Sequence, residues 1–169
     1  CVELNCRQLG IPLYDYLGGA VRHQLLFNGW IGEVSPQIAA EEARRWRDAG
    51  FESVKIKVGG GVATDAERVV AVNEAVGGAL KLRMDANQQY DARTALELCH
   101  ELRSVDMQLF EQPVPAEDLE GLRKVRRLGG LAVMADESIS DHASLIRVIK
   151  ADCADFVKFG VKQAGGLLS

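Results

Sequence analysis

Short apolar runs alternate with longer amphipathic stretches over most of this chain, and each pair repeats after about 25 residues. The apolar runs predict strands at residues 24–32, 53–58, 80–85, 107–111, 131–135 and 155–161. The intervening stretches predict helices at 36–50, 64–76, 92–103, 116–127 and 141–150. Alternation of this kind favours parallel strands joined by right-handed helical crossovers, in either an open doubly wound sheet or a (β/α)8 barrel.

The number of predicted strands limits the choice of fold. A complete barrel has eight strands and about 250 residues, whereas this chain has 169 residues and only six predicted strands. We therefore expect an α/β fold of the TIM-barrel type that is incomplete, with about six β/α units. The chain begins without Met inside a predicted helix and stops at Gly165-Gly166-Leu167-Leu168-Ser169, directly after a predicted strand. We expect a piece cut at both ends.

Composition excludes several classes of protein. Hydrophobic residues make up 47% of the chain and charged residues 26%, which is typical of a folded globular domain. The net charge is -4 with both signs interspersed, so neither nucleic acid nor a membrane surface is an expected partner. No apolar run approaches the roughly 20 residues that a membrane helix needs. A small molecule is the expected partner.

The cysteines indicate the compartment. The chain has four, and neither CxxC spacing nor a histidine pattern suited to zinc accompanies them. We expect reduced thiols in a cytoplasmic protein. These residues are Cys1, Cys6, Cys99 and Cys153.

Three carboxylates stand where predicted strands end: Asp85 in LRMDAN, Glu111 in LFEQP and Asp136 in VMADES. Their spacing of 26 and 25 residues matches one strand-helix repeat, so all three should project from the same rim on adjacent strands. Three converging carboxylates repel one another unless a cation lies among them, and hard oxygen ligands suit Mg²⁺ or Mn²⁺. The alternative is that each acid caps a helix or forms a surface ion pair. Better caps follow, however, at Asp91 and at Ser140 or Asp141.

Two lysines, Lys55 and Lys57, lie two residues apart in the apolar run before the first acid. Strand alternation places both on one face, which in a barrel is the lined interior. An unpaired ammonium there costs several kcal/mol, and a lysine that gives up its proton readily can act as a general base. The alternative is a solvent-facing pair on an edge strand, which the neighbouring acids disfavour.

Five motifs in order, KIKVG, RMDANQ, FEQPV, ADES and VKFGVKQAGG, resemble successive strands of the enolase superfamily. The similarity is to its mandelate racemase/muconate lactonizing enzyme family, in the muconate-lactonizing branch, and it covers essentially the whole chain. The opening LGIPLYDYLGG is similar to the segment that joins this family's capping domain to its barrel. The resemblance implies two parts: residues 1–23 as a remnant of that linking segment and residues 24–169 as a partial barrel.

The resemblance also implies a site and a reaction. Lys57 would abstract a proton alpha to a carboxylate, giving an enediolate stabilised by the metal, while Lys55 would contact the substrate carboxylate. Racemase or epimerase, cycloisomerase and dehydratase activities all stay open, each on a small carboxylate substrate. The implied metal ligands are Asp85, Glu111 and Asp136, and the implied supporting residues are Asn87 and Glu137.

One position departs from the family pattern. The family places a second lysine 24 residues after the third metal ligand, where this chain has Gly160. Lys158 and Lys162 lie on the same predicted strand face, and Lys162, nearer the catalytic rim, is the candidate replacement base. The competing hypothesis is therefore an impaired or non-catalytic partial barrel. In either case we expect a homo-oligomer, because an open parallel arc has two unpaired edges.

A nucleotide-binding doubly wound domain is the third hypothesis. Gly59-Gly60-Gly61 follows a predicted strand, but neither GxGxxG nor GxxxxGK[ST] is present. The motif evidence for this class is therefore weak.

Overall fold

The computed structural model describes residues 2–166 and shows a single six-stranded parallel sheet in which each strand pairs with the next along the chain. Its strands are β1 (Gly29–Ile31), β2 (Ser53–Lys57), β3 (Lys81–Asp85), β4 (Met107–Glu111), β5 (Val133–Ala135) and β6 (Phe156–Val157). Its helices are α1 (Val2–Leu9), α2 (Leu13–Tyr16), α3 (Pro36–Asp48), α4 (Val62–Val76), α5 (Ala92–Glu101), α6 (Leu119–Leu128) and α7 (His142–Ala151). Cys1 and the predicted chain end at 167–169 lie outside the described residues.

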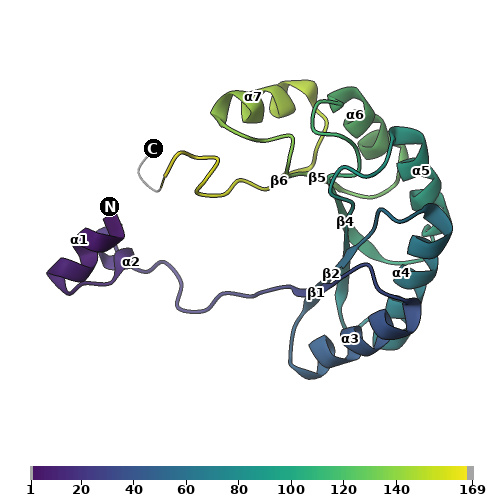
Figure 1. Cartoon of the computed structure of the whole chain (residues 1–169), viewed down its shortest axis with the longest axis horizontal. Helices are drawn as coiled ribbons and strands as arrows, with labels where there is room; N and C mark the ends of the chain where they lie inside the picture. The colour runs from purple at the N-terminus through teal and green to yellow at the C-terminus, as the bar shows by residue number, and fades with distance from the viewer. Residues whose placement is uncertain (1, 167–169) are drawn as a thin grey trace.

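The sheet is curved, and one helical layer covers its convex side. Helices α3 to α7 follow the strands around the outside of the arc, while α1 and α2 stand apart at the end of an extended segment (Figure 1). The sequential strand order excludes the doubly wound alternative, whose strand order reverses within the sheet. The fold is therefore a partial (β/α) barrel, as the sequence predicts.

The two faces of the sheet differ because strand side chains alternate. The convex face packs against the helices and carries the core, including Val54, Ile56, Leu82, Met84 and Phe110, all at most 1% exposed. Each such side chain contributes roughly 1.5–3 kcal/mol when it is fully buried. The concave face carries the alternate positions of the same strands, among them the charged residues Lys55, Lys57, Asp85 and Glu111.

The outer strands are shorter than predicted. Residues 24–32 were expected to be one strand, but only Gly29–Ile31 pairs, and Leu25 and Phe27 are exposed. Residues 155–161 were expected to be another, but only Phe156–Val157 pairs. Within the described chain each of these strands has a neighbour on one side only, so fewer ladder hydrogen bonds extend it.

Residues other than the strand-end acids cap the helices that follow the strands. Asp91 accepts a hydrogen bond from the backbone N–H of Thr94 at 2.7 Å and caps α5. Asp141, rather than Ser140, caps α7 by accepting from the N–H of Ser144 at 2.7 Å. Helix α6 begins at Leu119, later than the predicted 116, because Asp118 provides its cap. The caps predicted at Asp91 and at Ser140 or Asp141 are confirmed.

Two further properties of the described residues concern the cysteine thiols and the length of the helices. Cys6, Cys99 and Cys153 are buried free thiols, and burial raises the pKa of Cys99 to about 11. Among the helices of residues 2–166, none is sufficiently long and apolar to cross a membrane.

Candidate active site on the concave rim

The three strand-end acids lie on adjacent strands at one rim of the sheet. Asp85 is the last residue of β3 and Glu111 the last of β4, and the two are paired in register. Asp136 directly follows Ala135, the last residue of β5. Asp85 and Glu111 are buried, and Asp136 is partly buried. Residues spaced by one strand-helix repeat in the sequence thus lie together at the carboxyl ends of three parallel strands.

Lys55 and Lys57 project from β2 onto this rim. The Nζ atom of Lys55 lies 2.8 Å from Oδ2 of Asp85 and 3.3 Å from Oε2 of Glu111. The Nζ atom of Lys57 lies 2.7 Å from the same Oδ2 of Asp85, and it also donates to the Oδ1 atom of Asn87. Both lysines therefore belong to the concave face, and the solvent-facing alternative is wrong.

The electrostatics of Asp85 reflect these neighbours. Burial alone would raise the pKa of Asp85, but hydrogen bonds from Lys55 and Lys57 outweigh burial and hold that pKa below its ordinary value. The backbone N–H of Asn87 adds a further donor to Oδ1 at 3.1 Å. Asp85 is thus kept as a carboxylate, the form that a metal ligand requires.

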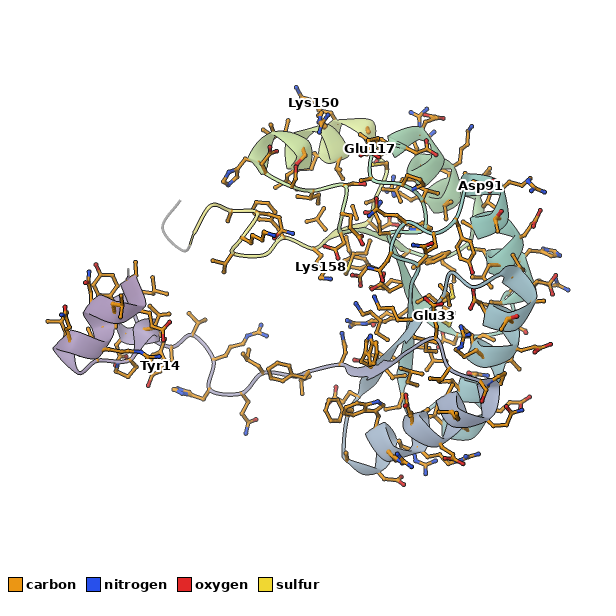
Figure 2. The ribbon with its side chains drawn as sticks, in the orientation of Figure 1. Tyr14, Glu33, Asp91, Glu117, Lys150 and Lys158 are labelled. Atoms are coloured by element: carbon orange, nitrogen blue, oxygen red, sulfur yellow. The ribbon has the colours of Figure 1, made fainter. Side chains whose placement is uncertain are left out.

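Lys158, just beyond β6, completes the row of charges. Its Nζ atom lies 2.8 Å from Oε1 of Glu111 and 2.7 Å from Oδ2 of Asp136. Figure 2 shows it pointing from the end of β6 into the concave side. Desolvation would lower the pKa of Lys158, but the hydrogen bonds to Asp136 and Glu111 outweigh it and raise that pKa.

The candidate replacement base, Lys162, does not lie in this cluster. It is exposed, in the turn that follows β6. Gly160 stands between the two lysines, and its backbone N–H donates to Oε1 of Gln163 at 3.2 Å. Lys158, and not Lys162, is therefore the lysine near β6 that contacts the acids. The predicted contact of Lys162 with the site is not observed.

The two supporting residues contact each other. Nδ2 of Asn87 donates to Oε1 of Glu137 at 2.8 Å, which connects the loops after β3 and β5. The other oxygen of Glu137, Oε2, is buried, and no donor among residues 2–166 reaches it. A buried carboxylate oxygen without a donor is costly, so this atom indicates a position where a cation or water would be stabilised.

Gln112, next to the second acid, was not singled out from the sequence. It is fully buried with a positive φ of 33°, and its Oε1 accepts from the N–H groups of Asp136 and Ser138 at 2.9 and 3.1 Å. Its Nε2 donates to Oγ of Ser138 at 2.8 Å. Gln112 therefore fixes the backbone that carries Asp136. The only sequence signal is its place in the FEQPV motif.

A second group that sequence reasoning missed supports the end of β2. The buried carboxylate of Asp65 pairs with Arg68 and accepts from the hydroxyl of Tyr90 and, at 2.8 Å, from the N–H of Gly59. Nη1 of Arg68 in turn donates to the carbonyl oxygen of Lys57 at 3.1 Å. The loop after β2, and with it the backbone of Lys57, is thereby held by a buried ion pair.

The donor set suits a hard divalent cation. Carboxylate oxygens from Asp85, Glu111 and Asp136 are the ligands that Mg²⁺ takes in proteins, usually together with water. Among residues 2–166 the three carboxylates do not converge on one point. The ammonium groups of Lys55 and Lys158 lie between them. The unpartnered Oε2 of Glu137 indicates that negative charge at this rim is incompletely balanced. The chemistry of the residues therefore fits the metal.

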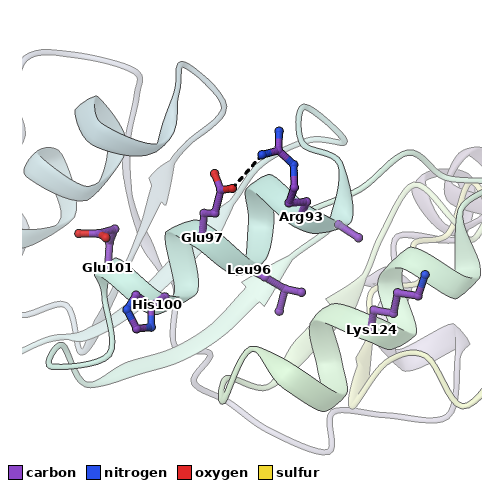
Figure 3. A pocket seen from close by; sticks show the side chains of 7 residues that line it. Arg93, Leu96, Glu97, His100, Glu101 and Lys124 are labelled. Atoms are coloured by element: carbon purple, nitrogen blue, oxygen red, sulfur yellow. Dashed lines mark hydrogen bonds and ion pairs between the residues drawn. The ribbon is translucent and has the colours of Figure 1, made fainter.

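A hollow between α5 and α6 is a separate feature on the helical layer. Leu96, His100 and Lys124 line it, beside the ion pair in which Arg93 lies 3.1 Å from Glu97 (Figure 3). None of the strand-end acids contributes to this hollow. The charged rim on the concave face is therefore the candidate active site.

Comparison with known proteins agrees with this fold. The family model described as "Enolase C-terminal domain-like" matches residues 38–169, and the chain belongs to this family. A hydrophobic dipeptide epimerase of Enterococcus faecalis is 35% identical over 99% of the chain and 47% of that protein. Muconate cycloisomerase 1 of Rhodococcus opacus is 34% identical over 95% of the chain and 44% of that protein.

Solved structures show the same similarity in three dimensions. The Enterococcus faecalis dipeptide epimerase in complex with Mg and the dipeptide L-Leu-L-Tyr superposes with a TM-score of 0.90 at 35% identity. The superposition covers 98% of this chain and 47% of that one. A mandelate racemase/muconate lactonizing family protein from Azoarcus sp. EbN1 gives a TM-score of 0.93 at 32% identity, over 99% and 44% of the two chains. The chain thus spans about half the length of the relatives it matches.

Proposed function

We propose that this chain carries the catalytic rim of a Mg²⁺-dependent or Mn²⁺-dependent isomerase that removes the proton alpha to a carboxylate. The main support for this proposal is the contact between Nζ of Lys57 and Oδ2 of Asp85, which lie 2.7 Å apart beside Glu111 on the next strand. A candidate base and candidate metal ligands are thereby adjacent on rigid strands. Racemases, epimerases and cycloisomerases are the reaction class that this arrangement and the relatives support.

Each residue has a defined task in this proposal. Asp85, Glu111 and Asp136 would hold the cation, which supplies positive charge that stabilises the negative charge developing on the substrate carboxylate. Lys57, in its unprotonated form, accepts the alpha proton: the C–H bond breaks, and its electron pair passes toward the carboxylate as an enediolate. Lys55 would contact the substrate carboxylate, where its ammonium is aligned by Asp85.

We propose dipeptides and N-acylated amino acids as the first substrates to test. The support is the similarity to the epimerase whose structure holds Mg and L-Leu-L-Tyr. The concave side is also suited to an anionic ligand, because Lys55 presents its ammonium there on a side chain that is 17% exposed. A muconate-type substrate is the cycloisomerase alternative, supported by the Rhodococcus relative.

Gly160 favours a second candidate function, a rim that exchanges a proton without inverting the carbon. Inversion needs an acid on the face of the enediolate opposite Lys57. Glycine has no such group, Lys162 is exposed in the following turn, and the ammonium of Lys158 is engaged by Glu111 and Asp136. An impaired partial barrel is the limiting case of this candidate.

We also propose that copies of the chain associate in the cytoplasm. The outer strands present apolar side chains: Trp30 of β1 is 54% exposed and Phe156 of β6 is 49% exposed. Unpaired strand edges with apolar residues favour association with a further chain. The buried thiols of Cys6, Cys99 and Cys153 fit a reducing compartment.

Proton NMR in D₂O tests the proposed chemistry. The 169-residue chain is incubated with Mg²⁺ and a panel of dipeptides and N-acylated amino acids, and loss of the alpha-proton signal is followed. Exchange that falls by about 10²-fold or more in Lys57→Gln supports the assignment. Lys81→Gln is the matched control, because Lys81 lies at the opposite end of the neighbouring strand β3. Equal exchange in wild type and Lys57→Gln, or none in wild type, would overturn it.

A further inference from the structure

Lys158 is more exposed to solvent than the two lysines of β2. Lys55 and Lys57 have side chains 17% and 21% exposed, whereas the side chain of Lys158 is 49% exposed. Its ammonium nevertheless contacts two acids, with Nζ 2.8 Å from Oε1 of Glu111 and 2.7 Å from Oδ2 of Asp136. It is a half-exposed lysine whose head lies between buried and partly buried carboxylates.

These contacts place the ammonium where a shared cation would be bound. Glu111 and Asp136 come from the ends of β4 and β5, so a cation that ligates both must lie between the two side chains. Lys158 donates into that space from just beyond β6, and its flexible side chain is half exposed to solvent. The ammonium can therefore leave by rotation of its own side chain, without movement of the sheet.

The charge balance of the rim points the same way. Three carboxylates, those of Asp85, Glu111 and Asp136, contact the three lysines Lys55, Lys57 and Lys158, and the fourth, that of Glu137, contacts Asn87 instead. With every group ionised the rim retains one negative charge, and without Lys158 it retains two. Withdrawal of Lys158 therefore removes one positive charge from the acids, and a divalent cation would replace it.

We propose that Lys158 is a displaceable counter-cation of this rim, which holds Glu111 and Asp136 together in the metal-free chain and must move out when a divalent cation binds. The inference rests on the proposed function for the existence of the metal site. It adds that this chain binds the metal more weakly than its carboxylates allow, because part of the binding energy is used to break two ion pairs.

The first test is calorimetric titration of Mg²⁺ into the wild-type chain and into Lys158→Met. Loss of the competing ammonium should tighten Mg²⁺ binding by about tenfold, a value discounted for the partial exposure of Lys158. Lys158→Arg keeps the positive charge and should bind as weakly as wild type. Lys150→Met is the matched control, since Lys150 lies on the outer helical layer (Figure 2) and its loss changes the net charge equally.

Thermal unfolding supplies a second readout that does not depend on activity. Without metal, Lys158→Met should unfold at a lower temperature than wild type, because the two acids lose their shared cation. With saturating Mg²⁺ the two midpoints should converge, so the Mg²⁺-induced rise is larger in the variant. Lys150→Met should behave as wild type under both conditions.

The results separate this inference from the metal site itself. Tighter binding in Lys158→Met alone, with the larger thermal shift, supports the displaceable counter-cation. Equal Mg²⁺ affinity in wild type and Lys158→Met overturns it and leaves the metal site standing. Absence of Mg²⁺ binding in both proteins overturns the inference and the proposed metal site together.

Discussion

The ammonium nitrogen of Lys57 lies 2.7 Å from Oδ2 of Asp85, and the two residues are register partners on adjacent parallel strands. Their separation is therefore set by the backbone ladder rather than by a loop. Substitutions at either position should change the chemistry of the rim while leaving the sheet in place.

The buried pair of Asp65 and Arg68 should be a main determinant of stability. Asp65→Asn leaves the guanidinium buried without its counter-charge and should lower the free energy of unfolding by about 3–5 kcal/mol. Urea unfolding measures the loss. The control is Glu97→Gln, which breaks the exposed pair with Arg93 and should cost less than about 1 kcal/mol. Similar losses in the two variants would contradict a structural role for the buried pair.

Gly160 should limit the stereochemical outcome of the reaction. If proton exchange occurs, wild type should exchange the alpha proton of one enantiomer with retention, with inversion slower by about 10²- to 10⁴-fold. Gly160→Lys should restore inversion, and the substitution is feasible because a Cβ there meets only the flexible end of Gln163. Proton NMR and chiral chromatography measure both rates. Wild-type inversion that disappears in Lys162→Ala would show that Lys162 supplies the second base.

The cap of α7 should give a pH-dependent contribution to stability. Hydrogen bonds from the backbone N–H and hydroxyl of Ser144 lower the pKa of Asp141 in the folded chain. A lowered folded pKa stabilises above the unfolded pKa, and this stabilisation is lost as pH falls through the folded value. The advantage of wild type over Asp141→Asn in thermal midpoint should therefore be complete at pH 7 and shrink below about pH 4. A difference that is independent of pH would contradict it.

Self-association should follow from the exposed outer strands. Light scattering at micromolar concentration should show a species larger than one chain, because Trp30 and Phe156 present apolar surface beside unpaired strand edges. The double variant Trp30→Lys and Phe156→Lys should shift the population toward monomer. A monodisperse wild-type monomer would rule out the proposed association.

The positions of the acids and of the β2 lysines were predictable from the sequence because each depends on local periodicity. A period of two places Lys55 and Lys57 on one face, and a one-repeat spacing places Asp85 and Glu111 at one rim. The extent of the last strand was not predictable in this way. Alternation holds only while the strand continues, and β6 ends at Val157, so Lys158 reaches the rim while Lys162 enters an exposed turn.

Other parts of the rim depend on contacts between residues far apart in the sequence. Asp65 meets Tyr90 across 25 positions, and Gln112 meets Ser138 across 26. The positive φ of Gln112 belongs to a backbone that these contacts stabilise, and no local pattern indicates it. Tertiary packing, not propensity, decides such positions.

Calorimetric titration of Mg²⁺ tests most directly whether the strand-end carboxylates form a metal site. Wild type should bind one Mg²⁺ per chain, and binding should be lost in Asp85→Ala and in Glu111→Ala. Glu117→Ala is the matched control, since Glu117 is an exposed acid in the loop before α6 (Figure 2), and it should bind as wild type does. Circular dichroism verifies that each variant is folded. Mg²⁺ binding that is equal in wild type, Asp85→Ala and Glu111→Ala would contradict the assignment of the rim as a metal site.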